Sequence, residues 1–147
     1  MASNPELKHT HLHKALPDFE GTATVRPTRV LLISATGEMG GAERSLYEVA
    51  RLLPSDALEL HACVSPGTPL GRLLGAAHVD VHEVALRRFR RSTHLAALAG
   101  NVRALYQASR QVSDICKSGG IDLLHANTNS AALVAWEVGR MTKLPFI

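Results

Sequence analysis

The chain has 147 residues, 46% of them hydrophobic and 20% charged, with a net charge of +3, which is typical of one globular domain with its own core. No stretch reaches the roughly 20 apolar residues that span a bilayer, and the N-terminus lacks the apolar core of a signal peptide, so neither an integral membrane protein nor a secreted one is expected. Aromatic residues make up only 4% of the chain, which argues against a nucleic-acid surface built on base stacking.

Residues 1–28 contain three prolines and no apolar periodicity, so they are expected to form a flexible leader ahead of a folded domain at residues 29–147. His9, His11 and His13 alternate within this leader and could chelate a metal ion. The sequence leaves open whether they do.

From Arg29 onward, apolar runs of strand length alternate with segments of helical period. Strands are predicted at residues 30–35, 58–64, 79–84 and 121–125. Helices are predicted at residues 42–53, 70–77 and 130–141, and along a longer segment with periodic apolar residues from Leu95 to Ile115, which Gly119 and Gly120 end. This alternation predicts an α/β fold, a Rossmann-like parallel sheet with helices on both faces.

Cys63 and Cys116 lie inside predicted elements and lack the spacing of a metal site or a disulfide framework. We expect both to be buried thiols in a reducing compartment, which indicates a cytoplasmic protein.

Three glycines follow the first predicted strand. Gly37, Gly40 and Gly41 stand between that strand and a helix, where bare N–H groups and the helix N-terminus favour an anion such as phosphate. Their spacing is neither the dinucleotide G-x-G-x-x-G nor the P-loop pattern, and the second strand does not end in the acidic residue that would hold a nicotinamide ribose. The alternative is a tight turn without a ligand.

Glu43, in the first helical turn, is expected to play a structural role because its carboxylate would repel a phosphate beside it.

A second polar loop, from His125 to Ser130, follows the fourth predicted strand. Ligands of open parallel sheets bind beyond the carboxyl ends of the strands, so this loop and the glycine turn are expected to form one cleft. The candidate acceptor or cleft residues are His125, Asn127, Thr128 and Asn129. His125 could instead be a satisfied core histidine, and Asn129 or Ser130 could simply cap the next helix.

Four arginines, Arg87, Arg88, Arg90 and Arg91, surround Phe89 before the long helix. Their forked donors could hold an anionic acceptor, or the headgroups of a membrane surface with Phe89 as an interfacial anchor. A solvated loop is the plainer interpretation.

The last residues, from Lys143 to Ile147, begin another apolar run in which Pro145 can open a strand. A parallel sheet that stopped at this point would leave an open edge unless further polypeptide completed it. The chain is therefore interpreted as a fragment, either natural or artificial.

Taken together, three segments resemble the N-terminal domain of family 4 glycosyltransferases, which are retaining enzymes of GT-B fold. They are Gly-Gly-Ala-Glu-Arg at 40–44 after a Val-Leu-Leu-Ile strand, Ile-Asp-Leu-Leu-His-Ala-Asn at 121–127, and Lys-Leu-Pro-Phe-Ile at 143–147. The resemblance covers residues 29–147.

The resemblance implies that this domain shapes the acceptor pocket and that Gly40 and Gly41 face the donor's phosphates across an interdomain cleft. A second Rossmann-like domain, in the same or a separate chain, would hold most of the nucleotide and carry the acidic motif. His125 matches the family's strand-end histidine, whereas Asn127 stands where many members have another histidine. No catalytic residue is identified, and neither a cofactor nor a metal is expected, because the folded part shows no metal-ligand cluster in its sequence.

The leading hypothesis is therefore the N-terminal part of an enzyme that moves a sugar from a nucleotide-sugar to a glycan or lipid-linked acceptor, either free in the cytoplasm or peripheral to the cytoplasmic face of the membrane. The fragment alone would be inactive. Two alternatives stay open: a stand-alone Rossmann-like binding or adaptor subunit without catalysis, and a nucleotide-sugar epimerase, which would need more acid–base groups than His125.

Overall fold

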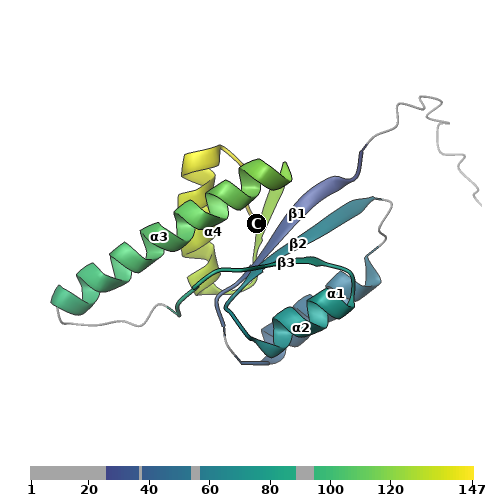
Figure 1. Ribbon diagram of the computed structural model, residues 1–147, viewed down its shortest axis with the longest axis horizontal. Coiled ribbons are helices and arrows are strands. Elements are labelled where there is room, and N and C mark those ends of the chain that lie inside the picture. The colour runs from purple at the N-terminus through teal and green to yellow at the C-terminus, as the bar shows by residue number, and fades with distance from the viewer. Residues whose placement is uncertain (1–25, 37, 54–56, 89–94) are drawn as a thin grey trace, which may run out of the picture.

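The computed structural model describes residues 26–36, 38–53, 57–88 and 95–147 (Figure 1). Strands and helices alternate along these residues. The strands are β1 (Thr28–Ser34), β2 (Leu58–Val64), β3 (Asp80–Glu83) and β4 (Leu123–Ala126). The helices are α1 (Gly41–Leu52), α2 (Pro69–Ala76), α3 (Leu95–Gly119) and α4 (Asn129–Thr142).

The strands of the described residues form one sheet in the order β3-β2-β1-β4, and every pairing is parallel. The chain adds β2 and β3 on one side of β1, then crosses over through α3 to place β4 on the other side (Figure 1). The strand order therefore reverses between β1 and β4, which is where open α/β sheets bind ligands. The predicted Rossmann-like fold class is confirmed.

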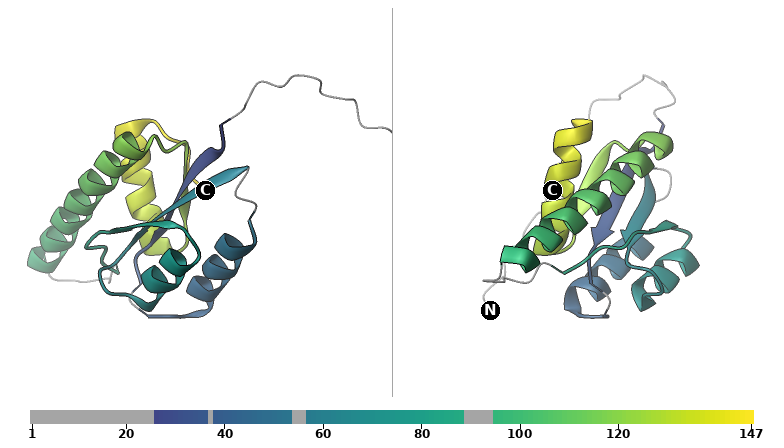
Figure 2. Two further views of the ribbon diagram at one scale, coloured as in Figure 1. Left: turned by 45° about the vertical axis from the view of Figure 1, so that its right-hand side comes forward. Right: turned by 60° about the vertical axis from the view of Figure 1, so that its left-hand side comes forward.

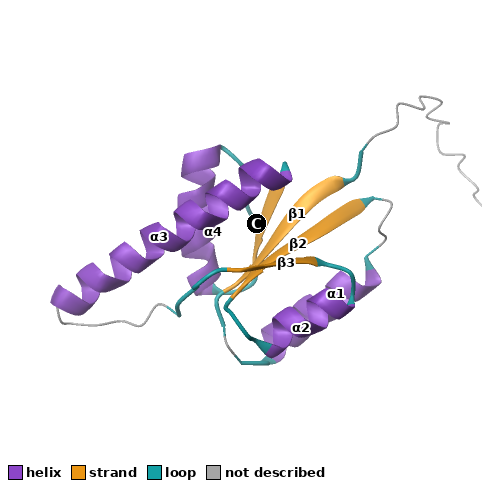
Figure 3. Cartoon of the chain, in the orientation of Figure 1, coloured by secondary structure: helices purple, strands orange, loops and turns teal. Residues whose placement is uncertain are grey.

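Two hydrophobic cores lie on opposite faces of the sheet, because successive side chains of a strand point to opposite sides. Leu31 and Ile33 of β1 belong to the core shared with α3 and α4. Val30 and Leu32 belong to the core shared with α1 and α2. Figures 2 and 3 show the two helix pairs on either side of the strands.

Both cysteines lie in the core between the sheet and the pair α3 and α4, with exposures of 0% for Cys63 and 2% for Cys116. Burial disfavours the charged thiolate, which raises the pKa of Cys63 to about 12 and that of Cys116 to about 11. The prediction of buried thiols is confirmed.

The segment after α4 turns back and pairs with β4. The backbone N–H of Leu124 donates to Pro145 at 3.0 Å, and that of Ala126 donates to Ile147 at 2.8 Å. The predicted strand-like run from Pro145 is therefore present as parallel pairing along β4. Within the described part of the chain, every helix is too short or too polar to cross a bilayer.

At the amino ends of the strands, Arg26 joins the first residues of the fold to β4. Its guanidinium donates two hydrogen bonds to Asp122, at 2.7 and 2.8 Å, and Asp122 also accepts the backbone N–H of Arg29 at 2.9 Å. Arg26, which precedes residue 29, the expected start of the folded domain, is thus held against the residue before β4.

Candidate functional site

The two polar loops predicted to form a cleft begin side by side at the strand-order reversal. The backbone N–H of Asn127, just after β4, donates to the carbonyl of Ile33 in β1 at 3.0 Å. Because β1 and β4 run parallel, the glycine turn and the loop after β4 leave the same edge of the sheet.

Gly40 and Gly41 play different roles in the glycine turn. Gly40 is the N-cap of α1, and its N–H donates to Oε2 of Glu43 at 3.0 Å. A Cβ atom at Gly40 would stand 2.9 Å from that oxygen, so the close approach of the carboxylate needs a glycine. A Cβ atom at Gly41 would meet nothing within 4 Å. Gly37 lies outside the described residues.

Glu43 is buried at 3% exposure and serves the turn itself, in keeping with its expected structural role. Its Oε1 accepts the Thr36 hydroxyl at 2.6 Å. Burial alone would raise the pKa of Glu43, but the hydrogen bonds from Thr36 and from backbone N–H groups outweigh it and hold the pKa below its usual value. Since Glu43 occupies the N–H of Gly40, a bound anion would depend on the N–H groups that follow, which have no acceptor within the helix.

His125 and Asn127 lie on the face of the sheet that α1 covers, because they alternate with Leu124 and share the face of Leu123. Both are half-buried. In the described part of the chain, Nδ2 of Asn127 is a buried donor without a hydrogen-bond partner. The amide of Asn127 therefore has a hydrogen-bond donor that the described residues leave unused.

The helix after this loop is capped by Thr128, whose hydroxyl accepts the backbone N–H of Ala131 at 3.2 Å. The expectation that Asn129 or Ser130 occupies the N-cap is wrong, because α4 starts one residue earlier than predicted. Thr128 is thereby committed to the helix end, and Asn129 becomes an exposed first residue of α4.

Ser34 is a further residue of this site that was not predicted from the sequence. It ends β1 on the same face as His125 and Asn127, is fully buried, and its hydroxyl has no hydrogen-bond partner among the described residues. A polar residue at the end of an otherwise apolar strand was the available signal.

Beyond β3, Arg87 and Arg88 are exposed, whereas Arg90 and Arg91 lie outside the described residues. The charge of Arg88 makes a small contribution to the low pKa of Glu43.

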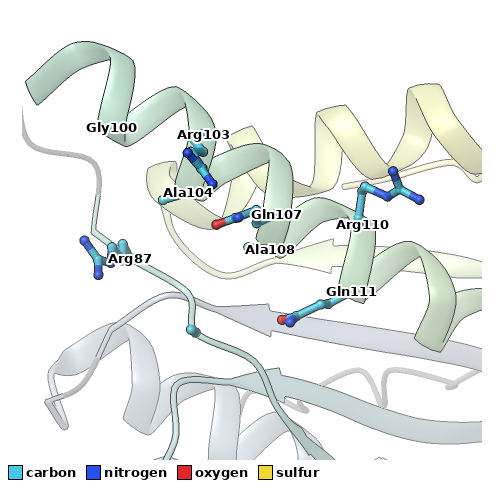
Figure 4. Close-up of a pocket in the computed structure, with 9 residues that line it drawn as sticks. Arg87, Gly100, Arg103, Ala104, Gln107, Ala108, Arg110 and Gln111 are labelled. Atoms are coloured by element: carbon cyan, nitrogen blue, oxygen red, sulfur yellow. The ribbon is translucent and has the colours of Figure 1, made fainter. Parts of the chain in front are cut away.

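Arg87 lines an open groove of about 560 Å³ between the segment after β3 and α3 (Figure 4). Arg103 and Arg110 of α3 contribute two further guanidinium groups, and Gln107 and Gln111 supply amides. No acidic residue is found among the described residues that line this groove. The three arginines give this groove a positive lining, which favours anions.

Sequence reasoning also missed a side-chain cluster formed by His61, Asp80 and His82 on β2 and β3. His61 is 19 positions before Asp80 and 21 before His82, and only the register of the two strands brings it to them.

No protein-family model matches this chain, and no curated protein sequence matches it significantly. Several solved structures are similar to it in fold. HepE from Anabaena, solved in complex with UDP and glucose, matches with a TM-score of 0.54 and 20% identity over 81% of this chain and 28% of its own. MurG from Acinetobacter baumannii matches with a TM-score of 0.60 and 15% identity over 82% and 34%.

The C-terminal domain of the PF1911 hydrogenase from Pyrococcus furiosus is equally similar, with a TM-score of 0.55 and 17% identity over 86% of this chain and 94% of that domain. At these identities the comparisons establish the Rossmann-like fold and not an activity. The chain spans about a third or less of HepE and MurG, so it corresponds to one part of those proteins.

Proposed function

We propose that this chain is the N-terminal, acceptor-side part of a retaining glycosyltransferase of GT-B fold. The whole protein would transfer a sugar from a nucleotide-sugar to a glycan or lipid-linked acceptor, and a C-terminal donor-binding domain, in the same or a separate chain, would hold most of the nucleotide. The likeness to part of HepE, whose structure contains UDP and glucose, supports the nucleotide-sugar class of donor.

One observation carries the proposal: the buried, unpartnered amide of Asn127 lies at the strand-order reversal, on the edge of the sheet where the glycine turn also lies. A buried donor is normally satisfied, so this amide is suited to a hydroxyl or phosphate oxygen of a ligand. Gly41, whose α-carbon faces open space, would let the first turn of α1 approach the donor's phosphates.

The acceptor side of the proposal rests on the groove beside α3. Arg87, Arg103 and Arg110 give it a positive lining, which favours an acceptor that carries phosphate or lies at an anionic membrane face. We therefore propose a cytoplasmic protein with peripheral contact to a membrane surface. Sugar transfer would need neither a cofactor nor a metal.

The test is the release of nucleoside diphosphate from a panel of nucleotide-sugars, by the full-length product of the gene and by the 147-residue chain. Turnover by the longer protein only is the expected result. Asn127→Ala in the longer protein should lower turnover about tenfold or more, because a hydrogen bond to the substrate is lost. Lys117→Gln, at the far end of α3, is the matched control and should leave turnover unchanged.

A second candidate function is a binding or adaptor subunit without catalysis. It is favoured by an apolar row on α3, where Leu98, Val102 and Tyr106 follow one another at four-residue steps with exposures of 45%, 54% and 49%. If the gene yields no longer product and the 147-residue chain is stable but does not turn over any donor, this function replaces the first.

A further inference from the structure

A cluster of polar side chains lies across the strands β2 and β3. His61 of β2 is paired in register with Asp80, the first residue of β3, and His82 stands two residues further along β3. Asp80 and His82 point to the same face because they are two residues apart in a strand. The three residues thus lie on strand backbone, at the edge of the sheet where β3 is the last strand (Figure 1).

The ligand-type atoms of these three side chains converge. Oδ2 of Asp80 lies 3.3 Å from Nδ1 of His61 and 3.5 Å from Nε2 of His82, and all three atoms lie within 4.8 Å of one another. Ligands 2.0–2.1 Å from a tetrahedral zinc ion stand about 3.4 Å apart. The two measured spacings therefore match neighbouring positions around one ion.

Both histidine nitrogens that face Asp80 lack a hydrogen bond. His61 is only 6% exposed, and neither its Nδ1 nor Nε2 of His82 has a hydrogen-bond partner within the described residues. The contacts with Asp80 are short enough for ion pairs but do not have hydrogen-bond geometry. Two buried nitrogens that lie within 3.5 Å of one carboxylate oxygen, without hydrogen-bonding to it, would be satisfied by a cation bound among the three groups.

The other ring nitrogen of His61 is already held. Its Nε2 lies 3.2 Å from Oε1 of Glu59, whose second oxygen accepts Nε–H of Arg29 at 2.9 Å. When Nε2 carries the proton that Glu59 accepts, Nδ1 is left with a lone pair that can bind a metal ion. This carboxylate-to-histidine arrangement is the one that orients metal-binding histidines and makes them more basic.

From this geometry we infer that His61, Asp80 and His82 bind one divalent transition-metal ion of the zinc type. Two imidazoles and one carboxylate favour such an ion over magnesium or calcium, which prefer oxygen ligands. The ion would tie the edge strand β3 to β2 and keep a coordination position open to solvent beside Asp80, which is exposed. The site is independent of the proposed sugar transfer.

The competing arrangement has no metal. A protonated His61 would then bridge Glu59 and Asp80 as an ion pair, with His82 stacked on it at a ring separation of 5.9 Å. This arrangement predicts no stoichiometric metal binding.

The experiment uses the 147-residue chain with His9, His11 and His13 replaced by alanine, so that the leader cannot chelate. Zn²⁺ is titrated by calorimetry, and Co²⁺ by its visible absorption. We expect one ion per chain. Asp80→Asn and His82→Gln should each weaken Zn²⁺ binding at least about 100-fold, because each removes a ligand, and both residues are accessible enough to be replaced without unfolding.

Glu59→Gln should weaken binding about 10- to 100-fold, since it removes only the support of His61. The matched control is His78→Asn, which replaces a neighbouring histidine outside the cluster, at a backbone φ of 62° that asparagine tolerates. This variant should bind Zn²⁺ like the parent chain.

Because His61 is buried, replacing it could unfold the protein, so its role is tested by NMR of the parent chain. On addition of Zn²⁺, the ¹⁵N resonances of Nδ1 of His61 and Nε2 of His82 should shift, while Nε2 of His61 stays protonated. Absence of Zn²⁺ and Co²⁺ binding by the parent chain, or equal binding by Asp80→Asn and His82→Gln, would overturn the inference.

Discussion

The carboxylate of Glu43 accepts the backbone N–H of Gly40 at 3.0 Å and thereby occupies a donor at the entrance to α1. Glycine has no side chain to complete a reciprocal capping box, so this bond is one-sided. The two adjacent glycines of the turn therefore differ: Gly40 holds the carboxylate of Glu43, whereas a Cβ atom at Gly41 would meet nothing within 4 Å.

Alanine substitutions should separate these roles. Gly40→Ala places a Cβ atom 2.9 Å from Oε2 of Glu43, so the charged hydrogen bond must break or lengthen, and the free energy of unfolding should fall by about 1.5–3 kcal/mol. Gly41→Ala meets no neighbouring atom and should be neutral or stabilise the helix by about 0.5–1 kcal/mol. Urea unfolding of both variants measures the difference, and equal losses would contradict it.

The low pKa of Glu43 predicts that stability depends on pH. A carboxyl group whose pKa is lowered in the folded state stabilises that state above its unfolded pKa, about 4.3, and this contribution is lost as the pH falls through the folded pKa. Glu43→Gln should thus be less stable than the parent at neutral pH by about 1–3 kcal/mol, and the gap should close in acid.

Urea unfolding from neutral pH into acid measures this gap for Glu43→Gln. Glu48→Gln, at an exposed position of the same helix, controls for the loss of one carboxylate. A gap that stayed constant over the whole pH range would show that the charge of Glu43 is not what stabilises the turn.

Much of the fold was predictable because its signals are local. Apolar runs and helical periodicity place every predicted strand and helix within two residues of its observed bounds, and residues 58–64 match β2 at both ends. The observed start of α4 differs from the predicted one because the capping residue determines it. Thr128 rather than Asn129 or Ser130 caps α4, since a threonine hydroxyl in extended backbone reaches the N–H of Ala131.

The sites were predictable only in part, because they depend on contacts between distant segments. The loop after β4 and the glycine turn could be brought together from the general rule for parallel sheets. The cluster of His61, Asp80 and His82 depends on the register of β2 against β3, which no local pattern specifies. The alternation of Asp80 and His82 in a short strand was a weak hint. Likewise, Arg103 joins Arg87 only through the packing of α3.

The buried cysteines should be inert in the folded protein. With pKa values of about 12 for Cys63 and about 11 for Cys116, almost no thiolate is present at neutral pH, and both sulfurs are closed off from solvent. A chromogenic disulfide reagent should titrate no thiol in the native chain and two per chain in denaturant. Rapid labelling of one thiol under native conditions would reveal local opening of the core between the sheet and α3.

The basic groove should bind anions through its arginines. Arg87→Gln combined with Arg103→Gln removes two of its guanidinium groups, each worth about 1 kcal/mol near an anionic surface, so binding to vesicles rich in phosphatidylglycerol should weaken about 25-fold at low salt. Added salt should weaken the binding of the parent chain. Arg51→Gln, on α1 outside the groove, changes the net charge without touching the lining and should reduce binding far less. Replacing Arg87, Arg88, Arg90 and Arg91 by serine extends the test to the whole arginine run.

Two outcomes would show that the groove is not the anion-binding surface. One is that the groove variants bind vesicles at low salt as tightly as the parent chain. The other is that Arg51→Gln weakens vesicle binding as much, for each charge removed, as the groove variants do.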